Sequence, residues 1–181
     1  MNLKVMTSAL LLAGLAAPSA FASTGTINFT GSITNVTCSV NGGTENGGPD
    51  FTVDIGAVSA GDFANVGDVS GRIGFRIYIG KDGESACAND TKVWATFENG
   101  ATVDAGGGLK VTGGASGVRI RLFDKNNDPI DILGNNQNNG VKETVVNNQA
   151  ILVYGAGYES TGTVVAGGAN SSVVYTVRYE S

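Results

Sequence analysis

The chain has 181 residues, a formal net charge of −5 and no histidine. This acidic balance argues against nucleic acid or an anionic lipid surface as a partner, because both attract basic proteins. Without histidine, neither a Ser-His-Asp triad nor a Cys-His pair can form. Composition therefore favours a structural or binding protein over an enzyme, with no catalytic or cofactor-binding residues expected.

The first residues predict export from the cytoplasm. Lys4 precedes an apolar run at 5–17, and the small residues of AFA at 20–22 complete the layout of a secretory signal peptide. The apolar run is too short to cross a membrane. We therefore expect residues 1–22 to be removed, which leaves Ser23 as the first residue of a mature chain without membrane insertion.

Residues 25–38, GTINFTGSITNVTC, alternate between apolar and polar side chains. Ile27, Phe29, Gly31 and Ile33 fall on one face, which is typical of a half-buried β-strand. The pattern alone favours the first strand of the chain's own fold over a strand that pairs with a neighbouring molecule.

Short apolar runs separated by Gly- and Asn-rich turns fill the rest of the chain. Regular short strands with turn signals between them predict a single all-β domain, a sandwich or a barrel. Two of the turns are long: NGGTENGGP at 41–49 and GNNQNNG at 134–140. The expected strands lie at 26–34, 36–40, 51–55, 72–79, 92–97, 109–112, 117–123, 129–133, 150–158 and 172–179.

Cys38 and Cys87 are the two cysteines of the chain. In an exported protein two cysteines most often pair, whereas two isolated thiols without histidine do not form a zinc site. We therefore expect a Cys38–Cys87 disulfide. Closing a loop of about 50 residues would stabilise the fold by roughly 4 kcal/mol.

The densest acidic segment, DKNNDPID, partly matches a calcium-binding loop. Asp124, Asn126 and Asp128 stand at its first, third and fifth positions. Pro129 replaces the glycine that such a loop needs, however, and Asn135 replaces its bidentate glutamate. A β-hairpin with a turn at KNNDP is the better interpretation, so no metal ligands are expected here.

Several stretches in this order resemble a chaperone–usher fimbrial subunit, a type 1-like pilin of Gram-negative bacteria. FTGSITNVTC is similar to the opening of that family, and Cys87 lies where the family has its second cysteine. GVRIRLFDKNNDPI resembles the mid-domain hairpin, and GYESTGTVVAGGANSSVVYTVRY resembles the C-terminal end. The resemblance covers essentially the whole mature chain.

This resemblance implies an incomplete immunoglobulin-like sandwich, open along a groove between its first and last strands. A periplasmic chaperone lends a strand to fill the groove, and at the outer-membrane usher the N-terminal extension of the next subunit replaces it. The product is a homopolymeric fibre on the cell surface that serves adhesion. Residues 23–33 would be the donor-strand extension, with Gly31 matching the family's donor-strand glycine, and residues 34–181 would be the pilin domain.

The last expected strand carries Val173, Tyr175, Val177 and Tyr179 on one face. An ordinary C-terminal core strand has this pattern, but the resemblance implies that these residues border the groove and are recognised by the chaperone. Two residues follow Tyr179, whereas this tyrosine is penultimate in most of the family.

Two other functions are compatible with the same sequence. A minor or capping fimbrial subunit would keep a groove that no donor enters. A self-contained, secreted lectin-like sandwich would need no partner strand and would carry aromatic residues on its loops. Tyr154, Tyr158, Tyr175 and Tyr179 lie in expected strands instead, which disfavours the lectin.

Overall fold

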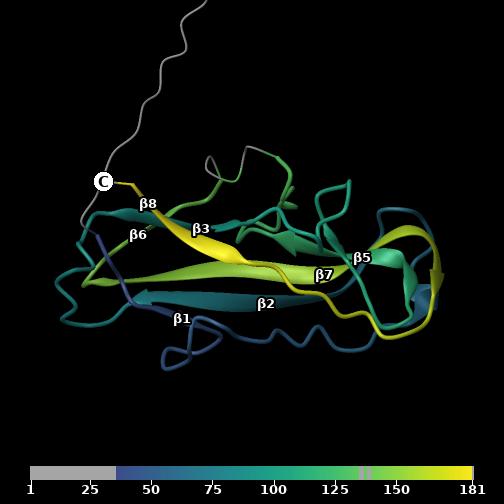
Figure 1. Cartoon of the computed structure of the whole chain (residues 1–181), viewed down its shortest axis with the longest axis horizontal. Helices are drawn as coiled ribbons and strands as arrows, with labels where there is room; N and C mark the ends of the chain where they lie inside the picture. Colours follow the sequence, from purple (N-terminus) through teal and green to yellow (C-terminus); the bar gives the residue numbers. More distant parts are fainter. Residues whose placement is uncertain (1–35, 135–136, 138–139, 181) are drawn as a thin grey trace, which may run out of the picture. The chain divides into compact units, whose positions relative to one another are not determined.

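The computed structural model describes residues 36–134, 137 and 140–180, which form two antiparallel β-sheets packed face to face (Figure 1). A short 3-10 helix, η1 (Ala60–Asp62), lies in the connection that leads into β2. The larger sheet has the order β1 (Val40–Gly42), β2 (Val69–Gly80), β7 (Gln149–Val165), β5 (Ser116–Phe123) and β4 (Leu109–Lys110). The smaller sheet has the order β6 (Glu143–Thr144), β3 (Lys92–Phe97) and β8 (Tyr175–Glu180).

The long strands β2 and β7 form the centre of the larger sheet. Ile77 pairs with Leu152, and both side chains are buried, at 0% and 2% exposure. Successive side chains of a strand point to opposite faces, so the neighbouring pair of Tyr78 and Ile151 lies on the outward face. The core therefore lies between the inward faces of β2 and β7 and the facing strand β3, whose Val93 has 0% exposure.

Most expected strands are present, and some are longer than expected. The strand at 92–97 coincides with β3, and the strands at 72–79, 109–112, 117–123 and 172–179 correspond to β2, β4, β5 and β8. The strand expected at 150–158 is the middle of β7, which continues to Val165 while it pairs with β5. The strand expected at 26–34 lies outside the described residues.

Three expected strands are wrong. At 36–40 only Val40 belongs to a strand, because Thr37 donates its backbone N–H to Ala86 in the loop after β2. At 129–133, one bridge from Phe123 to Pro129 is followed by a turn in which the Asp131 carboxylate accepts the Leu133 N–H. Residues 51–55 carry no strand pairing within the described chain. The two-residue strand β6 was not expected.

The disulfide between Cys38 and Cys87 is confirmed. It joins the start of the described chain to the loop after β2, and the Glu84 side chain strengthens this junction. Its two carboxylate oxygens accept the backbone N–H and the hydroxyl of Ser39 at 2.6 and 2.7 Å. The chain therefore enters the domain at a fixed point beside β1.

The acidic segment after β5 forms a tight turn. Asp124 Oδ1 accepts the backbone N–H groups of Asn126 and Asp128, each at 2.9 Å. The backbone N–H of Asp124 donates to the carbonyl of Asp128, which closes the turn. This carboxylate therefore organises its own backbone, in agreement with the hairpin interpretation.

Two side chains occupy the edge of β3 that faces away from β8. Strand β6 covers only Lys92 and Val93 on that side. Beyond it, the Tyr154 hydroxyl accepts the Ala95 N–H at 2.9 Å. Gln137 then bonds both backbone groups of Phe97, accepting its N–H at 2.9 Å and donating to its carbonyl at 3.0 Å. These side chains satisfy the groups that a longer β6 would otherwise pair.

Within the described residues, no helix is long and apolar enough to cross a membrane.

Candidate functional site

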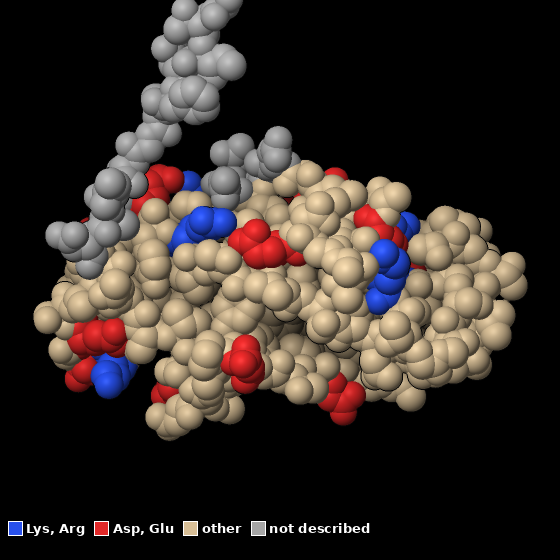
Figure 2. Space-filling view, viewed as in Figure 1, with Lys and Arg blue, Asp and Glu red and all other residues tan. Residues whose placement is uncertain are grey.

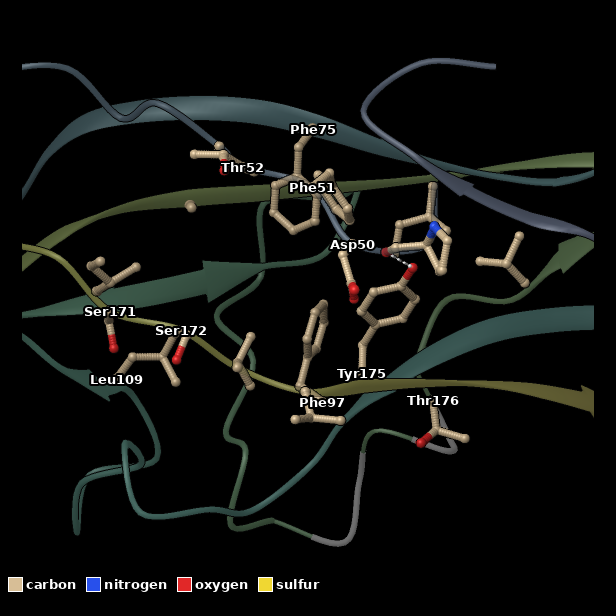
Figure 3. Close-up of a pocket in the computed structure, with 18 of the residues that line it drawn as sticks. Asp50, Phe51, Thr52, Phe75, Phe97, Leu109, Ser171, Ser172, Tyr175 and Thr176 are labelled. Carbon is tan, nitrogen blue, oxygen red and sulfur yellow. Dashed lines mark hydrogen bonds between the residues drawn. The ribbon is translucent and has the colours of Figure 1, made fainter. Parts of the chain in front are cut away.

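A groove of about 810 Å³ opens between two stretches of the chain that are distant in sequence. One rim is formed by residues 49–55, and the other by residues 171–179, which end in β8. The floor contains core side chains from both sheets, including Ile77 of β2. Phe75 of β2 and Phe97 of β3 also belong to it (Figure 3). The groove therefore reaches the hydrophobic core of the sandwich.

The groove is lined mainly by apolar side chains that remain partly exposed. Phe51 on one rim, Val177 on the other and Phe75 on the floor pack against the core but are only partly buried. Charged side chains are scattered over the face of the molecule shown in Figure 2, most of which is uncharged. An apolar opening of this size, continuous with the core, is typical of an interaction site.

Both rims offer backbone groups to a partner. Strand β8 pairs with β3 along one edge, and its other edge faces the groove. Among the described residues, no backbone–backbone hydrogen bond holds the extended segment 50–55 to a neighbouring strand. Unpaired strand edges are templates for β-sheet addition, so the arrangement suits an extended polypeptide between the rims.

Aromatic rings connect the rims to the core in one continuous series. Tyr175 of β8 contacts Phe51 edge-on, with ring centroids 6.1 Å apart. Phe51 contacts Phe75 at 5.9 Å, and Phe75 contacts Tyr154 at 5.8 Å. Tyr154 meets Phe97 of the facing sheet at 5.2 Å. Aromatic pairs at these distances are attractive beyond their buried area, so the series fixes the position of the 49–55 rim.

A hydrogen bond also crosses the groove. The Tyr175 hydroxyl donates to the backbone carbonyl of Pro49 at 2.6 Å (Figure 3). Partial burial raises the pKa of Tyr175 above its usual value, and the negative charge of Asp50 raises it further. The hydroxyl therefore keeps its proton, and with it the ability to donate, at neutral pH.

The four residues predicted to border the groove all line it. Val173, Tyr175, Val177 and Tyr179 are partly buried and packed against the core, whereas Val174 between them is 70% exposed. Val174 and Thr176 of the opposite face also border the groove, so the role of the predicted face as the chaperone contact stays a prediction. The predicted donor residues Ile27, Phe29, Gly31 and Ile33 lie outside the described residues.

Tyr179 also reaches the entry of the chain into the domain. Burial raises its pKa, although a hydrogen bond with the Cys38 backbone opposes that rise. The C-terminal end of β8 is therefore held next to the disulfide, on the side of the groove where the chain begins its first described strand.

The rim at 49–55 was missed by sequence reasoning as a functional element. Residues 51–55 were expected only as one strand of the domain, and they include Phe51, Val53 and Ile55. These three side chains do line the groove, but the segment pairs with no described strand.

Comparison with known proteins places these features in context. The family model described as "Fimbrial protein" matches residues 27–180. The major fimbrial subunit SMF-1 of Stenotrophomonas maltophilia is 34% identical over 174 residues, which cover 91% of this chain and 98% of that protein. The F17 fimbrial protein of Escherichia coli is 33% identical over 175 residues, covering 94% and 95% respectively.

Solved structures share the fold at lower sequence identity. A chain from a chaperone–usher pilus, in a study of rod uncoiling, matches with a TM-score of 0.59 at 20% identity, covering 91% of this chain and 100% of that one. The P pilus rod subunit PapA matches with a TM-score of 0.57 at 18% identity, covering 79% and 99%. The expected all-β, immunoglobulin-like sandwich is confirmed.

Proposed function

The chain belongs to the fimbrial protein family and is a structural subunit rather than an enzyme, and from this premise we propose that its groove accepts the N-terminal strand of a second copy. The observation that carries the proposal is the groove itself, which opens into the core between two rims with unpaired backbone edges. Addition of an extended peptide to such an edge is donor-strand complementation, a known form of β-augmentation.

The alternating segment at the start of the mature chain suits this groove chemically. Ile27, Phe29 and Ile33 present apolar side chains at a period of two, and Gly31 interrupts them. Burying two isoleucines and one phenylalanine contributes roughly 5–9 kcal/mol before the cost of ordering the strand. Backbone hydrogen bonds to the rims fix the register, so residues 23–33 act as the donor extension and 34–181 as the accepting domain.

The same groove supports the need for assembly partners. Before a donor arrives, the apolar lining and both rims face solvent, which favours aggregation. A periplasmic chaperone that lends a strand protects them, with the face of Val173, Tyr175, Val177 and Tyr179 as its contact. An outer-membrane usher then exchanges that strand for the extension of the next subunit, and the fibre emerges on the cell surface for adhesion.

Two substitutions on opposite faces of the extension test this assignment. In cells that express the chain with its chaperone and usher, Gly31→Arg should abolish fibres seen by electron microscopy, because arginine cannot enter the groove. The chaperone complex should still be recovered, since its formation does not use the extension. Ser32→Arg, which points to the other face, should leave fibres intact. Fibres of normal length from Gly31→Arg would show that this segment is not the donor.

A further inference from the structure

Tyr175 ties the two rims of the groove together. Its hydroxyl bonds to the Pro49 carbonyl at 2.6 Å, and its ring contacts Phe51 of the same rim (Figure 3). Pro49 and Phe51 belong to one rim, whereas Tyr175 begins β8 on the other. A single side chain therefore spans the gap that a partner strand would have to occupy.

A strand seated between the rims would have to pass this bond. Neighbouring strands lie about 4.8 Å apart, so an inserted strand needs roughly twice that distance between the rim backbones. It also draws its hydrogen bonds from the backbone groups of both rims. The Tyr175 hydroxyl bonds to the Pro49 carbonyl on one of those rims, so the tyrosine side chain lies across the space that the strand would enter.

We propose that Tyr175 is a latch, whose bond to Pro49 must open before a donor strand enters, so that this hydroxyl limits the rate of strand insertion. The inference rests on the proposed function of the groove. It assigns to Tyr175 a positioning role on the rims, distinct from the apolar contact that its ring makes with Phe51.

The latch is separable from the contacts that hold each rim. Backbone pairing of Tyr175 with Phe97 anchors the start of β8 to β3 without the hydroxyl. Phe51 keeps its contact with Phe75, and its ring lies so close to Gly42 that a side chain there would collide with it. Removing one oxygen from Tyr175 therefore leaves both rims in place.

Another hydroxyl lies close to chain segments on both sides, but it holds them weakly. Tyr158 Oη lies 3.5 Å from the carbonyl oxygens of Gly56 and of Ala169, which lie just beyond the two rims. These separations are at the limit of a hydrogen bond, whereas 2.6 Å is a short and strong contact for a hydroxyl. The Tyr175–Pro49 bond, rather than the Tyr158 contacts, is therefore the one expected to limit how fast the rims separate.

Tyr175→Phe tests the latch because it keeps the ring and removes the donor. The full mature chain is refolded at high dilution, and a fluorescent peptide of residues 24–35 (TGTINFTGSITN) is added. Binding and release are followed by fluorescence anisotropy. Loss of one hydrogen bond from the closed groove should speed association roughly two- to tenfold, while the half-life of the bound peptide stays unchanged because the latch is open in both complexes.

Tyr78→Phe is the matched control, since Tyr78 lies on the outward face of β2 and should leave both rates unchanged. Equal association rates for wild type and Tyr175→Phe would overturn the latch alone. Faster release from Tyr175→Phe would also overturn it, because the hydroxyl would then stabilise the complex. No peptide binding by either chain would overturn the proposed function, and the latch with it.

Discussion

Replacing Tyr154 with phenylalanine is expected to weaken the fold and to change its response to alkali. The Tyr154 side chain lies in the core, 7% exposed, and its hydroxyl accepts the N–H of Ala95 on the edge of β3. Burial is the main cause that raises the pKa of Tyr154 from 10.0 to about 12, although the hydrogen bond with the Ala95 backbone opposes that rise. Tyr154→Phe removes both the acceptor and the titrating group.

The size of each effect follows from these contacts. Leaving the buried Ala95 N–H without an acceptor costs about 1–3 kcal/mol at neutral pH. The folded state holds the phenol more tightly protonated than the unfolded state, because its pKa is raised. The stability that the protonated Tyr154 phenol gives to the folded state is therefore fully present below pH 10 and is lost as the pH rises through 12. A shift of about two units corresponds to a loss of about 2 kcal/mol by pH 12.

Both the cost of the lost hydrogen bond and the effect of Tyr154 ionisation can be measured by urea unfolding from pH 8 to pH 12. The sample is the full mature chain with the peptide of residues 24–35 bound. The stability difference between wild type and Tyr154→Phe should shrink by about 2 kcal/mol over the alkaline range. Tyr78→Phe removes a hydroxyl from the outward face, and its free energy of unfolding should change with pH in parallel with that of wild type. If the curves of wild type and Tyr154→Phe are also parallel from pH 9 to 12, Tyr154 does not titrate as the burial of its ring implies.

Two further predictions concern the disulfide and the edge of β3. Replacing Cys38 and Cys87 together with serine opens a link across 49 residues and should lower the free energy of unfolding by about 4 kcal/mol, measured by urea unfolding; a loss below 1 kcal/mol would contradict the loop-closure argument. Gln137→Ala strips both backbone partners from Phe97 and should cost about 1–3 kcal/mol. It should also raise lateral association in light scattering, and unchanged scattering would show that Gln137 does not protect this edge.

Sequence periodicity predicted which side chains face inward. The strand at 92–97 and the inward face of Val173, Tyr175, Val177 and Tyr179 follow from alternation alone, because burial of one face of a sheet imposes a period of two. The disulfide followed from the cysteine count in a chain whose first residues predict export. These features depend on local pattern or composition, and both are visible in a single sequence.

Pairing partners were harder to predict. The alternation of Phe51, Val53 and Ile55 indicates an extended segment with one buried face. The pattern is the same whether the strand that pairs with this segment comes from this chain or from another. Gln137 looks like any other polar residue of GNNQNNG, although it bonds the distant backbone of Phe97. Such contacts join residues far apart in sequence, and no local pattern records them.

The side chains that bond to the edge of β3 affect how many strand connections each subunit can make. An uncovered edge on that side would be a second place for a strand to add. Gln137 and Tyr154 occupy it, so within the smaller sheet the longer open edge is that of β8. If growth uses that edge as proposed, each subunit has one acceptor and one donor, which is a valence of two, and copies would join end to end in an unbranched line. A chain with both edges available would branch into a network instead.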